Sequence, residues 1–183
     1  MVTHCTALSF LDISDNEAVG RAVRHLGPRI ECLIAGDLSN EEPLDVILGH
    51  LAAGNGRHLK YLSLFGALGS LRSLAEFSQL SKLELHFYTD EELPNYLADI
   101  GVLNLSSLVL EQIRCYECPS AVNAAQFEAM LARSGGLRRL QITGDFDWNL
   151  RLTDESLRRL TVLCPRLQEL TLNGKEFEKG FCD

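Results

Sequence analysis

LKYLSLFGA, residues 59–67, places leucines at positions 59, 62 and 64, and this L-x-x-L-x-L spacing recurs along the chain. Seven such triplets carry leucine or a similar apolar residue at the three positions; they begin at Leu8, Ile30, Leu59, Leu80, Leu105, Leu137 and Leu167. Successive triplets start 22, 29, 21, 25, 32 and 30 residues apart. A motif that returns at such intervals indicates a solenoid of stacked units, and we expect residues 1–183 to form one domain.

Each triplet fits a short β-strand, because side chains two residues apart point to the same face of a strand. Strands are therefore predicted near residues 8–13, 30–35, 59–64, 80–85, 105–110, 137–142 and 167–172. The inward leucines of each strand would be buried only against those of the neighbouring units.

Between the triplets, apolar residues recur with the period of a helix. One stripe consists of Leu44, Ile47, Leu48 and Leu51, with Pro43 in the first turn and Gly54 near the end. Four further helices are predicted from the stripes Ala18–Val19–Ala22–Val23–Leu26, Leu93–Tyr96–Leu97–Ile100, Val122–Ala125–Met130–Leu131 and Leu157–Leu160–Leu163. The shorter segment between Leu64 and Leu80 has room for one or two turns. Strand and helix in alternation predict an α/β fold with a parallel sheet.

Residues 152–172, LTDESLRRLTVLCPRLQELTL, resemble the cysteine-containing repeat of F-box/leucine-rich-repeat proteins, the substrate receptors of cullin-type ubiquitin ligases. The matching features are Leu152-Thr153-Asp154-Glu155 at the start of the helix, Leu157 and Leu160 within it, and Leu163-Cys164-Pro165 before the strand. Cys5-Thr6-Ala7-Leu8 repeats part of this signature. The resemblance to leucine-rich repeats covers nearly all of the chain. It implies a horseshoe of about seven repeats, with parallel strands on the concave face and helices on the convex face.

An F-box would have to precede the repeats of that family, whereas here the first triplet begins at Leu8. The nearest similar segment, Leu93-Pro94-Asn95-Tyr96-Leu97, fits a repeat helix better. A ribonuclease-inhibitor-like or RanGAP-like array is a second resemblance, carried by LSFLDISDNEAVGRAVRHL (residues 8–26) with Asn16 at the asparagine position.

Charge and hydropathy exclude several classes of partner. The net charge is −8, and residues 1–120 hold 8 Lys and Arg against 16 Asp and Glu, so the surface should repel nucleic acid and anionic membranes. No apolar run reaches the roughly 18 residues of a membrane span, and the amino terminus lacks the basic and apolar regions of a secretory signal. We expect an intracellular, cytoplasmic protein without membrane insertion. Arg138, Arg139, Arg158 and Arg159 could meet an acidic partner or be ordinary solvated charges.

Nothing in the sequence favours catalysis, a cofactor or a metal site. The six cysteines are expected to be free thiols, and Cys115 and Cys118 form a lone C-x-x-C without a second pair of ligands. The five histidines show no metal-ligand spacing, and no phosphate-binding loop or nucleophile motif is present. Because a catalytic triad can assemble from distant residues, sequence alone does not exclude an enzyme.

The candidate partner-binding residues lie between the inward leucines, where side chains should point to solvent. They combine large apolar groups with polar neighbours: Phe10, Asp12, Ile34, Tyr61, Phe65, Glu84 and His86. Exposed apolar side chains with a polar rim are typical of interfaces. The alternatives are that the rings shield adjacent strands, or that the register is shifted by one residue, which would exchange the two faces. Trp148, in residues 145–149, is a further candidate or a residue that closes the core below its loop.

Two functions remain compatible with the sequence. In the first, the chain is a non-catalytic protein-protein interaction module, for which the resemblance suggests the substrate-recognition part of a ubiquitin ligase. In the second, it is an architectural subunit of a larger assembly, held mainly through its uncapped ends and its helical face. The edge of the first strand and the Phe177/Phe181 tail are the contacts expected at those ends.

Overall fold

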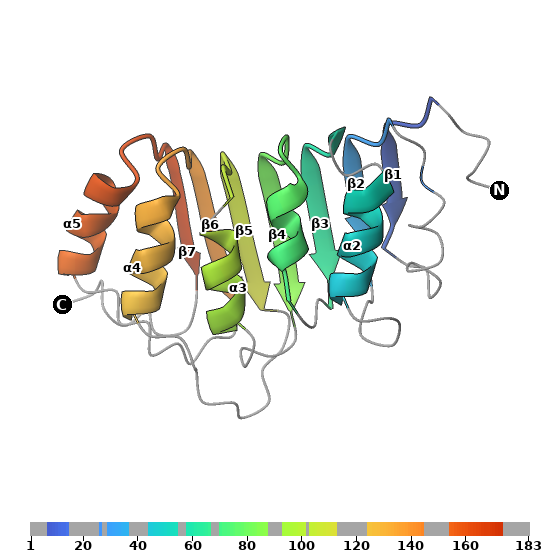
Figure 1. The fold of residues 1–183 in the computed structure, drawn as a ribbon. Helices are drawn as coiled ribbons and strands as arrows, with labels where there is room; N and C mark the ends of the chain where they lie inside the picture. The colour runs from blue at the N-terminus through green and yellow to red at the C-terminus, as the bar shows by residue number, and fades with distance from the viewer. Residues whose placement is uncertain are drawn as a thin grey trace.

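The chain forms a seven-stranded parallel sheet whose strands follow one another in sequence order (Figure 1). A computed structural model describes residues 7–14, 26, 29–36, 44–54, 58–66, 70–87, 93–101, 103–112, 124–144 and 154–173. The strands are β1 (Phe10–Ile13), β2 (Cys32–Ala35), β3 (Tyr61–Phe65), β4 (Lys82–Phe87), β5 (Ser107–Gln112), β6 (Arg139–Gly144) and β7 (Glu169–Asn173). The sheet is open, with β1 and β7 at its edges. The predicted α/β class with parallel strands is confirmed.

Each strand begins two residues later than the sequence predicted. The first apolar residue of each triplet lies before the strand. Between this residue and the strand, two successive backbone amides donate to one carbonyl of the preceding unit, in place of a regular strand ladder. The amides of Lys60 and Tyr61 both donate to the carbonyl of Glu31, at 2.8 and 3.0 Å. The same shared acceptor recurs at every junction between neighbouring strands. Sequence periodicity could not reveal this, because the first leucine is buried whether it lies on the strand or on the turn before it.

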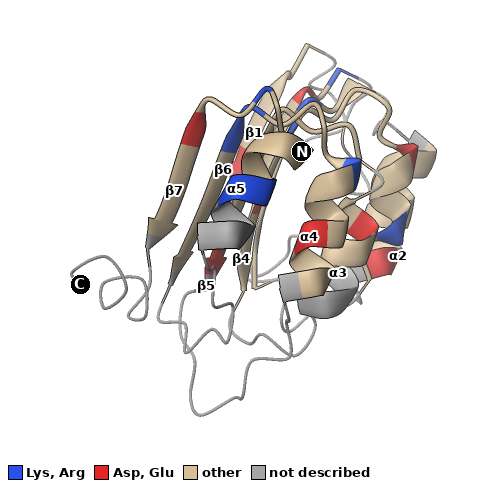
Figure 2. Cartoon of the chain, turned by 90° about the vertical axis from the view of Figure 1, so that its left-hand side faces the viewer, with Lys and Arg blue, Asp and Glu red and all other residues tan. Residues whose placement is uncertain are grey.

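Helices cover one face of the sheet, so that the molecule has two layers (Figure 2). The described residues form α2 (Leu44–Gly54), the 3-10 helix η4 (Arg72–Glu76), α3 (Leu93–Ile100), α4 (Ala124–Arg133) and α5 (Asp154–Leu163). Their buried residues include Ile47, Leu48, Leu51, Leu97, Ile100, Met130, Leu131 and Leu160, as the helical stripes predicted. The one or two turns predicted between Leu64 and Leu80 are present as the short helix η4. The helix predicted from residue 18 to 26 lies outside the described residues except for Leu26, which is buried.

A tight turn of constant form joins three of the helices to the next strand. In each, the amide of the first triplet leucine donates to the carbonyl three residues earlier: Leu80 to Phe77, Leu137 to Ser134 and Leu167 to Cys164, all within 3.0 Å. Ser134 and Cys164 are therefore equivalent residues. Both side chains are buried, and the Cys164 thiol lies 3.7 Å from the carbonyl oxygen of Leu131 in the preceding unit. Cys164 is thus a small buried residue with a free thiol, and burial raises the pKa of that thiol.

The core lies between the sheet and the helices as one connected cluster of buried residues. The second triplet position forms a column across the sheet in which five consecutive residues are fully buried: Leu33, Leu62, Leu83, Leu108 and Leu140. Each of these leucines packs between its equivalents in the two adjacent strands, because parallel strands lie roughly 4.8 Å apart. None of the helices in the described part of the chain combines the length and apolarity that a membrane crossing requires.

Candidate binding surface on the open face of the sheet

The helices lie on one face of the sheet, and we call the opposite face the open face (Figure 2). The described candidate residues alternate along the strands with the buried leucines and therefore belong to the open face. Strand pairing arranges its residues in three rows. The first row is Phe10, Cys32, Tyr61, Lys82, Ser107, Arg139 and Glu169; the second is Asp12, Ile34, Ser63, Glu84, Val109, Gln141 and Thr171; the third is Phe65, His86, Glu111, Thr143 and Asn173. This register agrees with the predicted one, so the alternative shifted by one residue is excluded.

The open face is less exposed than alternation predicts. Phe10 on the edge strand is 54% exposed, whereas Ile34, Tyr61 and Phe65 are half-buried. The expectation that all three rows point freely to solvent is wrong for Ser63, Val109 and His86, which are buried. Phe65 stacks on His86 of the neighbouring strand, so this ring shields an adjacent strand, whereas the Phe10 ring is exposed. Both predicted roles of the rings therefore occur on this face.

Tyr61 and Glu84 join β3 to β4 through their side chains. The Tyr61 hydroxyl donates a hydrogen bond of 2.8 Å to Oε2 of Glu84. Desolvation, together with this bond to a carboxylate, raises the pKa of Tyr61 to about 12. The phenol is consequently a fixed donor that holds the Glu84 carboxylate over the centre of the sheet.

His86 lies between two carboxylates and against an aromatic ring. Its Nδ1 lies 3.0 Å from Oε2 of Glu111, and its ring stacks on Phe65 with 4.0 Å between centroids and 4° between planes. The other nitrogen, Nε2, is 3.9 Å from Oε2 of Glu84, too far for a hydrogen bond, and it has neither exposed surface nor a hydrogen-bonding partner. Glu84 and Glu111 both keep partly exposed side chains. The result is an acidic cluster of Glu84 and Glu111 in which Nε2 of the buried His86 has no hydrogen-bonding partner.

Gly66 ends β3 beside this cluster in a conformation that suits glycine. Its φ of 66° lies in the left-handed region, and its amide donates to the carbonyl of His86 at 2.8 Å. The chain can therefore turn away directly after Phe65 while the Phe65–His86 stack stays in place.

The remaining predicted residues are spread over other parts of the molecule. Asp12 accepts hydrogen bonds from the amide and hydroxyl of Ser14, at 3.0 and 2.8 Å, and the backbone bond is the main cause of its lowered pKa. Asp12 therefore stabilises the turn after β1 as well as lining the second row. Trp148 lies outside the described residues.

Two of the four arginines, Arg139 and Arg159, lie in different layers of the molecule. Arg139 belongs to the sheet and its Nε lies 3.5 Å from Oε2 of Glu169. Arg159 belongs to α5, and its Nη1 lies 3.0 Å from Oε2 of Glu128. At least these two arginines have carboxylate partners within the chain.

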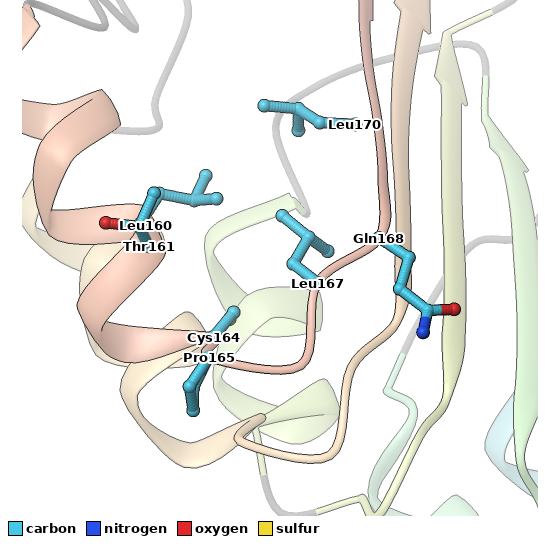
Figure 3. Close-up of a pocket in the computed structure, with 7 residues that line it drawn as sticks. All are labelled: Leu160, Thr161, Cys164, Pro165, Leu167, Gln168 and Leu170. Carbon is cyan, nitrogen blue, oxygen red and sulfur yellow. The ribbon is translucent and has the colours of Figure 1, made fainter.

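Sequence reasoning missed an apolar groove at the β7 end of the molecule (Figure 3). It has a volume of about 420 Å³ and is lined by Leu160, Thr161, Cys164, Pro165, Leu167, Gln168 and Leu170. Leu160, Leu167 and Leu170 point into the space between α5 and β7, whereas Gln168 points away (Figure 3). Leu170 is 41% exposed although it continues the column of buried leucines. A second groove, lined by Ala7, Ser9, Arg29, Glu31 and His58, precedes β1 to β3. Leu170 is the last leucine of the column and has no further strand beside it among the described residues of the sheet. This position in the repeat pattern was the sequence signal that could have predicted the first groove.

Comparison with known proteins adds no family to these observations. The chain matches no family model, and neither curated proteins nor solved structures contain a significant match to it. Within the described residues, no three His, Cys, Asp or Glu side chains are grouped as metal ligands. The chemistry of the open face is thus that of a surface with apolar rings and partly exposed carboxylates.

The raised pKa of Tyr61 makes a direct prediction for alkaline titration. Because the folded pKa of about 12 exceeds the ordinary value of about 10, the neutral phenol stabilises the fold below pH 10, and this contribution is lost as pH rises through 12. Ultraviolet absorbance titration of the wild type and Tyr61→Phe should differ by one late-ionising phenol. A difference spectrum that titrates near the ordinary value would show that Glu84 does not hold the Tyr61 hydroxyl.

Proposed function

We propose that this chain is a non-catalytic protein-protein interaction module of the leucine-rich repeat type, whose open face binds a protein partner. The repeat assignment is supported by seven parallel strands in sequence order, by the column of buried leucines and by the constant turn and shared-carbonyl contacts between units. In such arrays the sheet face is the extended surface available for binding.

One observation carries the proposal: side chains with large apolar groups lie on the open face of three consecutive strands, next to carboxylates. Phe10 on β1, Ile34 on β2, and Tyr61 and Phe65 on β3 keep exposed or half-exposed surface. Glu84 and Glu111 border them on β4 and β5. Interfaces are enriched in aromatic side chains at the centre and polar groups at the rim, and this face has both.

The resemblance to F-box/leucine-rich-repeat proteins extends the proposal to the kind of partner. The buried Cys164, its thiol contact to the preceding unit and the turn to Leu167 give the cysteine-containing motif a structural role. On this reading the chain is the substrate-recognition part of a ubiquitin ligase, and the open face holds the protein to be modified.

Affinity capture of the tagged chain from its native cells, followed by quantitative mass spectrometry, tests the proposal. The receptor reading predicts recovery of a ligase adaptor and cullin together with substrate proteins. A fixed set of subunits without ligase components would contradict that reading. Capture by the wild type and by Val162→Ala, a change at a 78% exposed position of α5, should be equal if the open face is the binding surface.

The groove at β7 favours a second candidate function, an architectural subunit. Among the described residues of its column from Leu33 onward, Leu170 alone is exposed, and an added strand with apolar side chains would bury it. The outer edge of β7 also carries backbone groups that, in β1 to β6, pair with the next strand. A neighbouring subunit that continues the sheet would satisfy both requirements.

Leu170→Asp separates the two candidate functions. If another subunit covers the β7 groove, a charge at this position should weaken association by about tenfold or more, because an unpaired carboxylate would be buried. Val46→Asp on α2, which is exposed to a similar degree, is the matched control. Co-purification and sedimentation of the assembly measure the effect. Unchanged association of Leu170→Asp would exclude the β7 edge as the architectural contact.

A further inference from the structure

The acidic cluster on β3 to β5 carries an inference about the chemistry of the partner. We propose that the carboxylates of Glu84 and Glu111 receive a basic side chain of the partner in competition with a proton on His86. This inference rests on the proposed function, because it assigns the partner's chemistry at the same open face.

The unpaired nitrogen of His86 is the observation that separates this cluster from an ordinary group of surface acids. His86 is only 9% exposed; its Nδ1 lies 3.0 Å from Glu111, whereas Nε2, 3.9 Å from Glu84, has no hydrogen-bonding partner. When Nε2 carries no proton, its lone pair faces Oε2 of Glu84 at 3.9 Å. That oxygen already accepts from the Tyr61 hydroxyl, so Nε2 is the acceptor left without a donor. Water does not reach Nε2, because that atom has no exposed surface.

Two kinds of positive charge can offset the negative charge of Glu84 and Glu111: a proton on His86, or a basic side chain of the partner. A proton on Nε2 would make His86 an imidazolium between the two glutamates and would neutralise part of their charge. Without that proton, Glu84, two residues before His86 on β4, and Glu111, paired with His86 on β5, carry negative charge next to the stacked His86–Phe65 pair. A lysine or arginine of the partner can then lay its aliphatic stem over Phe65 and place its charged end against the exposed carboxylates.

The surrounding charges favour a cation. Across the elements next to His86, the titratable groups are Tyr61 on β3, Lys82 and Glu84 on β4, and Glu111 on β5. Tyr61 stays neutral and donates to Glu84, so it fixes that carboxylate without cancelling its charge. Lys82 belongs to the first row, two residues from Glu84 along β4. On β1, Asp12 adds a further negative charge to the second row.

Competition between a proton and a basic side chain predicts pH-dependent binding. Protonation of His86 places positive charge beside the carboxylates and should reduce affinity for a cation as the pH falls. Histidine is the side chain whose charge most commonly changes near neutral pH. If His86 competes with the basic side chain, affinity should be lower at about pH 6 than at about pH 8, and binding should release protons.

A short lysine-rich peptide, with a glutamate-rich peptide as the negative probe, tests the proposal by titration calorimetry on the full chain. Glu84→Gln and Glu111→Gln should each weaken binding of the lysine-rich peptide by roughly threefold to tenfold. Glu76→Gln, which removes the same charge from exposed η4, should leave the affinity within about twofold. His86→Gln should bind the peptide with little change between the two pH values. Equal affinities for all four variants would overturn the proposal.

Proton release by the wild type provides a test that needs no variant. Calorimetry in buffers with different ionisation enthalpies should show proton release on peptide binding, and nuclear magnetic resonance should assign it to His86. Binding without proton release would overturn the competition with His86. If the peptide does not bind but a protein partner is captured through Tyr61 and Phe65, the inference fails and the proposed function stands. If neither the peptide nor a protein binds, both fail.

Discussion

Replacing Leu108 with alanine is expected to lower the free energy of unfolding by about 3 kcal/mol. Leu108 lies at the centre of the column of buried leucines, paired with Leu83 on one side and Leu140 on the other, and it is fully buried. The substitution removes buried apolar surface and leaves a cavity, and the neighbouring strands can collapse into it only partly. Urea unfolding monitored by circular dichroism measures the change.

Val162→Ala is the matched control for this stability prediction. Val162 is 78% exposed on α5, so its truncation should change the free energy of unfolding by less than about 0.5 kcal/mol. If Leu108→Ala were no more destabilising than Val162→Ala, the leucine columns would not be the core that holds the strands together.

The double variant Tyr61→Ala/Phe65→Ala is expected to abolish binding of a protein partner to the open face. Aromatic residues at the centre of an interface contribute about 2 kcal/mol or more each when truncated, so the two changes should weaken affinity by a factor of about a thousand. The variant also removes the hydroxyl that holds Glu84 and the ring that stacks on His86. Titration calorimetry with the captured partner measures the loss.

The double variant must remain folded for this result to have meaning. Both side chains are half-buried on the face away from the core, so the structure predicts a smaller loss of stability than that of Leu108→Ala. Circular dichroism and the unfolding midpoint provide the check. Tyr61→Phe is a milder companion, because it keeps the ring and removes only the hydroxyl. Retained affinity in a folded double variant would assign the partner to the edge strands or to the helices.

The sequence predicted the fold well because its two periods of apolar residues, that of a strand and that of a helix, have simple physical causes. Leu62 and Leu64 had to share a face of β3, and Ile47, Leu48 and Leu51 had to share a face of α2. The predicted strand starts were wrong by two residues because the shared-carbonyl turn depends on backbone hydrogen bonds. Phe127, fully buried in α4, continues the stripe of Met130 and Leu131 backward by one turn, so the helical period contained that signal. Ala125, which the stripe had included, is exposed.

The candidate surface was predicted less completely because contacts between strands decide exposure. Alternation places His86 on the open face correctly, but the His86 side chain is buried, stacked on Phe65 and in contact with Glu111. Neither partner lies near His86 in sequence, and only the register brings the three residues into one row. The exposure of Leu170 likewise depends on the place of β7 at the edge of the sheet. Such features require the packed structure.

Hydroxyl-radical footprinting of the full chain, free and bound to the captured partner, tests the central claim most directly. The oxidation of side chains reports their exposure, so a partner on the open face should protect Phe10, Tyr61 and Phe65 while Val162 stays reactive. Protection of Val162 and Leu170 with unchanged oxidation of the three aromatic residues would contradict a binding function of the open face and would favour the architectural alternative.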